Sequence, residues 1–73
     1  MNGIFYALGT GALVLVNVGS FALNADVIRG YKSLYGQSAR QHFQELKELR
    51  KTRTPAVYYL TYPATKLAER IYF

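Results

Sequence analysis

The segment IFYALGTGALVLVNVGSFALNA, residues 4–25, decides the fold of this chain, because its twenty-two residues include no charged side chain. As an α-helix it would rise about 33 Å, close to the thickness of a bilayer's hydrocarbon core. The first charged side chains follow at once, at Asp26 and Arg29. A chain of 73 residues has too little sequence left to cover a helix that is apolar on every side. We therefore predict a transmembrane helix over residues 1–25.

The rest of the composition suggests a chain that depends on neighbours. It has no cysteine, so neither disulfides nor size can stabilise a separate domain. All nine Lys and Arg and all four acidic residues lie beyond residue 25, which places the whole net charge of +5 in residues 26–73. We expect no independent globular core.

A secretory signal is the alternative for the apolar run. Ser20 and Ala22 place small residues three and one positions before a potential cleavage site. Signal sequences begin with a basic region, however, and no Lys or Arg precedes this run. We expect the segment to be retained as a membrane span.

One face of the predicted span suits helix packing. At 100° per residue, small and polar residues gather on this face, and apolar residues suited to lipid gather opposite. The expected packing interface comprises Gly3, Ala7, Thr10, Gly11, Asn17, Ser20 and Asn24. An amide within the bilayer needs a partner, and such interhelical hydrogen bonds contribute about 0.6–2 kcal/mol. We therefore assign Asn17 to a helix contact; the alternatives are an ion or proton path and a pigment or lipid contact.

Basic residues after the span predict its orientation. Arg29, Lys32 and Arg40 lie within about fifteen residues of the span, and positive residues stay on the cytoplasmic or matrix side. Residues 26–37 are predicted to be a basic exit segment at the membrane interface. Arg29 and Lys32 are candidate contacts for anionic lipid headgroups.

The C-terminal part predicts two amphipathic helices joined by a strap. Residues 38–53 begin with a capping-box pattern at Ser38 and Gln41 and end before Pro55. Residues 54–62 are predicted to be extended, and Pro63 suits the first turn of a helix over residues 63–73. The expected docking residues are Phe43, Leu46 and Leu49 on the first helix and Leu67, Ala68, Ile71 and Tyr72 on the second. The surrounding tyrosines favour docking on protein over a membrane surface.

Nothing in the sequence predicts catalysis. His42 is the single histidine, so the usual ligands cannot form a protein-only metal site, and only an axial contact to haem or chlorophyll remains as an alternative. No nucleophile stands beside a base, and there is no glycine-rich phosphate loop. Acidic residues lie among the basic ones, which argues against nucleic-acid binding. We expect no catalytic residue, metal, cofactor or small-molecule substrate.

This order of parts resembles a known class of membrane subunit. An N-terminal span, a basic exit such as DVIRGYK and a charged helix such as FQELKELRKTR are similar to the single-span accessory subunits of mitochondrial respiratory complexes. The layout is most similar to the MWFE-type subunit of complex I and next to subunit e of ATP synthase. The resemblance covers the architecture of most of the chain and carries over no functional residue.

We therefore expect an all-α membrane protein of the mitochondrial inner membrane, with its C-terminal part on the matrix side. Its expected partners are membrane lipids and other subunits of an electron-transport complex, which it stabilises without performing chemistry. The alternatives are an ATP synthase accessory subunit, a small regulatory peptide of a pump or channel, and a photosystem small subunit. A reversible regulator would leave the region beyond residue 37 exposed, whereas a built-in subunit would bury it between other chains.

Overall fold

The computed structural model describes the backbone of residues 2–73 and the side chains from residue 9 onward. Its described part is helical almost throughout and contains no strand. The elements, in chain order, are α1 (Asn2–Tyr35), the 3-10 turn η1 (Gly36–Ser38), α2 (Ala39–Arg53), α3 (Pro55–Leu60) and α4 (Tyr62–Tyr72). The all-α prediction is confirmed.

Helix α1 is the dominant element. Its 34 residues rise about 51 Å, and the longest dimension of the molecule is also 51 Å. By length and composition it is the one helix in the described part that could cross a membrane. Only 17% of its most apolar stretch is buried, whereas the core helix of a soluble protein would be mostly covered. The helix also continues ten residues past Ala25, so most of the segment over residues 26–37 is helical.

The chain reverses direction at Gly36. This glycine has a φ of +59°, a left-handed conformation that other residues adopt only with strain. The predicted capping box at Ser38 does not form. The Ser38 hydroxyl instead donates to the carbonyl of Tyr35 at 3.0 Å, and the Ala39 N–H donates to the carbonyl of Gly36. The 3-10 turn thus supplies an acceptor to the first N–H of α2, and the Ser38 hydroxyl is used within the turn.

The prediction of an extended strap over residues 54–62 is wrong, because α3 occupies most of this segment. Thr54 alone separates α2 from α3, with φ −134° and ψ 63°. Pro55 then fits the first turn of α3, where its fixed φ is helical and its missing N–H is not needed. Pro63 has the same role in α4, which begins one residue earlier than predicted. Each proline therefore ends one helix and begins the next.

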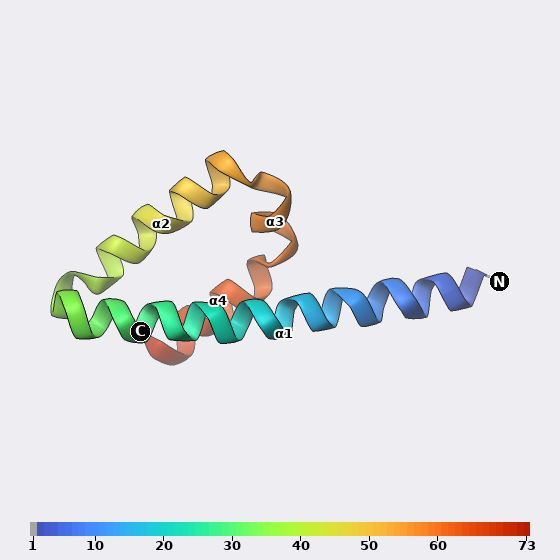
Figure 1. Cartoon of the computed structure of the whole chain (residues 1–73), viewed down its shortest axis with the longest axis horizontal. Helices are drawn as coiled ribbons and strands as arrows, with labels where there is room; N and C mark the ends of the chain where they lie inside the picture. The colour runs from blue at the N-terminus through green and yellow to red at the C-terminus, as the bar shows by residue number, and fades with distance from the viewer. Residues whose placement is uncertain (1) are drawn as a thin grey trace.

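Helices α2 and α4 both pack on the C-terminal half of α1. Figure 1 shows α4 beside the middle of α1, α2 leaving at an angle, and the N-terminal part of α1 projecting away from the other helices. Hydrogen bonds from Asn24 to Thr65 and from Arg29 to Tyr72 show that α4 runs parallel to α1. The predicted amphipathic faces therefore meet partners within their own chain in part.

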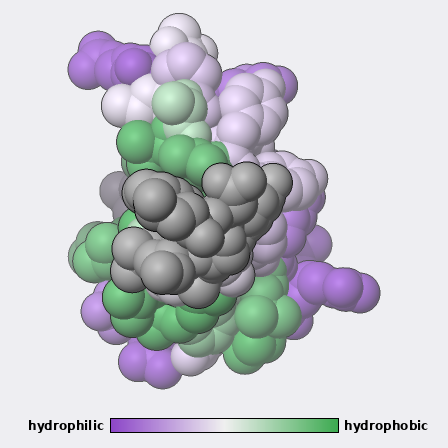
Figure 2. Space-filling view, turned by 90° about the vertical axis from the view of Figure 1, so that its right-hand side faces the viewer, coloured by the Kyte–Doolittle hydropathy of each residue, from purple (hydrophilic) through white to green (hydrophobic). Residues whose placement is uncertain are grey.

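A small core lies between these three helices. Ile28 of α1, Phe43 of α2 and Ala68 of α4 are fully buried at its centre. Partly buried side chains surround them: Phe21, Val27, Tyr31, Leu46, Tyr72 and Phe73. The chain thus builds a small core of its own. In the view of Figure 2, hydrophobic residues lie above and below the centre of the face, residues of intermediate hydropathy lie at its upper right, and hydrophilic residues lie towards the margins.

Candidate functional site

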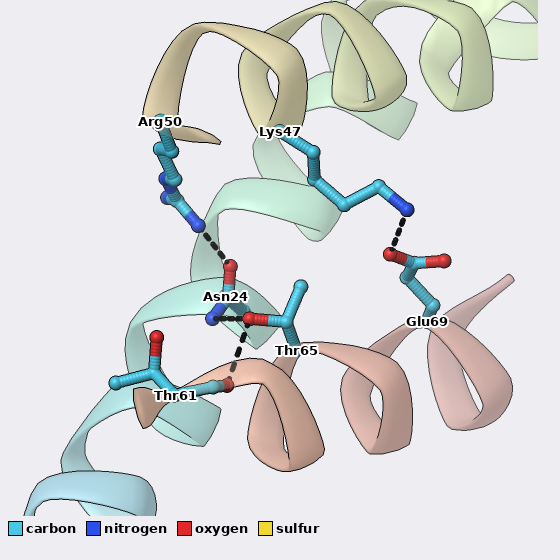
Figure 3. Close-up of polar contacts among 6 residues, drawn as sticks. All are labelled: Asn24, Lys47, Arg50, Thr61, Thr65 and Glu69. Atoms are coloured by element: carbon cyan, nitrogen blue, oxygen red, sulfur yellow. Dashed lines mark hydrogen bonds and ion pairs between the residues drawn. The ribbon is translucent and has the colours of Figure 1, made fainter. Parts of the chain in front are cut away.

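A buried polar junction joins α1, α2 and α4 at Asn24, which is 1% exposed. Its Oδ1 accepts a hydrogen bond from Arg50 Nη1 at 2.7 Å. Its Nδ2 donates to the Ser20 carbonyl at 2.8 Å and contacts the hydroxyls of Ser20 at 3.2 Å and Thr65 at 3.3 Å. Figure 3 shows Asn24 between Arg50 and Thr65. The amide therefore has partners on all three helices.

Two threonine hydroxyls continue this junction from α4 to α3. The Thr65 hydroxyl donates to the Thr61 carbonyl at 3.1 Å, and the Thr61 hydroxyl donates to the Val57 carbonyl at 2.7 Å. Thr61 and Thr65 are both buried. Their hydrogen bonds offset the cost of burying two hydroxyl groups.

An ion pair adds a second link between α2 and α4. Lys47 Nζ lies 2.6 Å from Glu69 Oε1, at an angle outside hydrogen-bonding geometry, and the two side chains are 9% and 14% exposed. The sequence analysis did not single out either residue. The available signal was spacing, since Lys47 follows the buried Phe43 by four residues and Glu69 follows the buried Thr65 by four. Both charged groups thus lie beside the buried stripes of their helices.

Asn17 forms a separate polar contact, nearer the free end of α1. Its Nδ2 donates to the carbonyl of Leu13 at 3.0 Å and to that of Leu60, the last residue of α3, at 3.1 Å. Two amide protons facing two carbonyls fix the orientation of this amide. Its Oδ1 is buried and has no partner in the described part of the chain. Asn17 thus contacts the end of α3 and leaves one acceptor free.

Of the remaining residues of the predicted packing face, some have contacts within the chain and others are exposed. Ser20 joins Asn24 in the polar junction. Thr10 and Gly11 are exposed, and a Cβ added at Gly11 would meet no atom within 4 Å. Gly3 and Ala7 lie outside the residues whose side chains are described. The structure therefore brings together only the C-terminal part of this face.

The basic residues after the apolar segment contact the end of α4. Arg29 Nη2 donates to the Tyr72 hydroxyl at 3.0 Å, and its guanidinium carbon lies 5.0 Å from the centre of that ring. Lys32 Nζ donates to the Tyr72 carbonyl at 2.7 Å. The partial negative charge at the C-terminal end of α4 attracts both cations. Both side chains also remain exposed, so solvent or a headgroup can still reach them.

The predicted docking residues are partly buried within the chain and partly exposed. Phe43 and Ala68 are fully buried, and Leu46 and Tyr72 are half-buried. The exposed docking residues are Leu49, Leu67 and Ile71, at 48%, 51% and 59%. The buried residues of α4 are Ala64, Thr65 and Ala68, and Tyr72 also contacts α1. Small side chains let the two helices approach closely.

The chemistry-bearing residues of the described part do not form a metal centre. No group of three or more His, Asp or Glu in this part of the chain could hold a metal ion. His42 stacks on Tyr35, with ring centres 3.8 Å apart, and lies 3.8 Å from Glu45. A groove of about 530 Å³ between α1 and α4 is lined almost wholly by apolar side chains. It has the character of a packing or lipid surface.

Comparison with protein-family models, with curated proteins and with solved structures finds no match to this chain.

Proposed function

We propose that this chain is a single-span, non-catalytic accessory subunit that stabilises a large electron-transport complex of the mitochondrial inner membrane, complex I in first place. The main support is the division of α1 into two unlike parts. Its C-terminal half packs against α2 and α4, whereas residues 9–23, the described apolar part before Asn24, are largely uncovered. An uncovered apolar helix needs lipid or other subunits as its surroundings.

The exposed side chains indicate how much surface needs a partner. Six large apolar residues of α1 are between 45% and 73% exposed: Leu13, Val14, Leu15, Val16, Val18 and Leu23. Full burial of one such side chain is worth about 1.5–3 kcal/mol. Together these residues favour insertion strongly, while α2 and α4 carry the charged residues that suit an aqueous compartment.

The proposed partner contacts involve α1 and one face of α4. The exposed apolar side chains of α1 and the exposed Leu67 and Ile71 on α4 need a partner surface. Apolar side chains of neighbouring helices packed against α1 and α4 would cover these surfaces. A subunit of this kind acts by holding its neighbours in place.

A reversible regulator of a pump or channel is the second candidate. It is favoured by the packing of α2 and α4 on their own α1, since this region then needs no other chain to become ordered. The proposed matrix or cytoplasmic position of this region follows from Arg29, Lys32 and Arg40 and applies to either candidate.

Native electrophoresis of gently solubilised membranes distinguishes the two candidates. A tagged chain that is a built-in subunit should migrate wholly with one large complex, in constant ratio to that complex's other subunits. Mass spectrometry of the band then identifies the complex and tests the assignment to complex I. A chain that migrates mostly free, or leaves the complex on dilution, would support the regulator and contradict the proposed role.

A further inference from the structure

We propose that the corner between α3 and α4, residues 54–65, enters the lipid beside α1 and is held there by Asn17. This inference rests on the membrane span of the proposed function and does not depend on the accessory role. It gives the C-terminal region a membrane-embedded wedge in addition to the span.

The depth of the corner follows from its contact with α1. If residues 4–25 span the hydrocarbon core, Asn17 lies roughly 12 Å inside the edge marked by Ala25, at 1.5 Å per residue. The Leu60 carbonyl is 3.1 Å from Asn17 Nδ2, so the end of α3 has the same depth. Thr65, which contacts Asn24, lies at the edge of the core. Helix α4 therefore rises from within the lipid to its surface.

The composition of the corner suits this position. Residues 54–65, TPAVYYLTYPAT, carry no charge, although Arg53 precedes them and Lys66 follows them. Val57, Tyr59 and Leu60 are between 56% and 60% exposed, so the corner presents apolar and aromatic surface. Tyrosine is enriched where hydrocarbon meets headgroups. Charge returns only where α4 reaches the level of Asn24.

The backbone of the corner is also suited to a medium without water, where an unpaired polar group is costly. Asn17 supplies a donor to the carbonyl of Leu60 at the end of α3. At the bend itself, the Thr61 N–H donates to the Val57 carbonyl at 3.0 Å. Pro55 and Pro63 stand in the first turns of α3 and α4, where an N–H would otherwise lack an acceptor. Each proline thus removes one donor from a first turn that would otherwise leave it open.

Lipid is a better occupant for this surface than a soluble partner because the surface is continuous with the span. The groove beside the corner is formed jointly by Leu13, Val14 and Phe21 of α1 and by Pro63 and Leu67 of α4. The medium that surrounds α1 at this level therefore also reaches α4. Two basic side chains border the corner: Arg50 lines a groove with Val57 and Thr61, and Lys66 Nζ lies 5.6 Å from the centre of the Tyr62 ring. Such long side chains can bury their stems in an apolar surface and extend the charged group towards water.

Tryptophan fluorescence can test this placement, because the chain has no native tryptophan. Leu60→Trp reports on the corner, Leu15→Trp on the span and Leu49→Trp on exposed apolar surface of α2. Each full-length variant is reconstituted in phosphatidylcholine vesicles with and without brominated acyl chains, and acrylamide serves as the aqueous quencher. We expect L60W to have blue-shifted emission and to lose fluorescence to brominated lipid as L15W does. We expect L49W to be quenched by acrylamide instead.

The reverse pattern would overturn the inference. Acrylamide quenching of L60W with lipid quenching of L15W would place the corner in water while leaving the span intact. Loss of lipid quenching at L15W as well would show that the span itself, and with it the proposed function, is wrong. Protection of L60W from both quenchers would indicate a contact between copies of the chain and would also contradict lipid exposure.

Asn17→Leu, introduced into L60W, tests the role of the anchor. We expect lipid quenching of L60W to fall, because the bond to Leu60 is lost, while the same substitution leaves L15W quenched by lipid. Thr10→Leu is the matched control, since it also raises the hydropathy of α1 but removes no contact to α3. Equal quenching of L60W with and without Asn17 would contradict the anchoring role of this residue.

Discussion

Arg50 Nη1 lies 2.7 Å from Asn24 Oδ1, so a cationic side chain of α2 is bound to a fully buried amide of α1. Asn24 immediately precedes Ala25, the last residue of the uncharged run over residues 4–25. The contact therefore joins the folded C-terminal region to α1 at the point where the apolar part of that helix ends.

We expect Asn24→Ala to lower the free energy of unfolding by about 1–3 kcal/mol, because Arg50 and Thr65 would lose a buried partner. Thermal unfolding of the purified chain in detergent, followed by the near-ultraviolet circular dichroism of its tyrosines, would measure the change. Gln44→Ala is the control, since Gln44 is an exposed amide of α2. Equal stability of the two variants would show that the junction does not hold the helices together.

The ion pair between Lys47 and Glu69 gives a second prediction. Lys47→Met should destabilise the chain by about 3–5 kcal/mol, because Glu69 would keep an uncompensated charge in a largely buried position. The double variant with Glu69→Leu should recover most of the loss. The exposed pair of Asp26 and Arg29, 3.9 Å apart, is the control, and Asp26→Asn should cost only about 0–1 kcal/mol. Thermal unfolding of all three variants tests this order, which a negligible effect of Lys47→Met would contradict.

Replacement by alanine should change the stability of the chain in opposite directions at Gly30 of α1 and at Gly36 of η1. Gly36→Ala should cost about 1–2 kcal/mol, because φ is +59° at this position. Gly30→Ala should stabilise the chain by up to about 1 kcal/mol, because Gly30 lies within the helix and an added Cβ meets no atom within 4 Å. Helicity measured by far-ultraviolet circular dichroism during thermal unfolding would resolve the two signs. A loss of stability in both variants would contradict this assignment.

Removal of residues 63–73 should reduce incorporation of the chain into its complex more than replacement of Lys51 and Arg53 by Gln. The truncation removes Ala68 from the core and the exposed surface of Leu67 and Ile71, whereas Lys51 and Arg53 are solvent-exposed. Co-purification with the complex measures both effects. Turnover per intact complex should remain normal, because we expect no catalytic group. Equal incorporation of the truncated and full-length chains would contradict this prediction.

The sequence predicted the long apolar helix correctly, because an uncharged apolar run of spanning length favours one continuous helix. It could not predict α3, because six apolar and aromatic residues between two breaks show no period that separates helix from strand. The sequence of α3 also contains no feature that predicts its tertiary position, at the corner beside Asn17.

The contact surface of α4 shows a further limit of prediction from sequence. The sequence pattern selected Ala68 and Tyr72, which do pack within the chain, but also Leu67 and Ile71, which are exposed. It did not select Thr65, which is buried and contacts Asn24. Close approach of two helices favours small side chains, and the hydroxyl of Thr65 conceals its part in this contact. Lys47 and Glu69 were missed for a related reason, since charged residues on amphipathic helices are usually solvated.

Cysteine labelling across the membrane tests the central claim most directly, since the chain has no native cysteine. Asn2→Cys marks the start of α1 and Lys51→Cys marks the exposed end of α2. In sealed mitoplasts, a membrane-impermeant maleimide should label only Asn2→Cys, and Lys51→Cys should react only after the membrane is opened. Labelling of both positions in sealed mitoplasts, or of neither, would place the two ends of the molecule on one side and contradict a single membrane span.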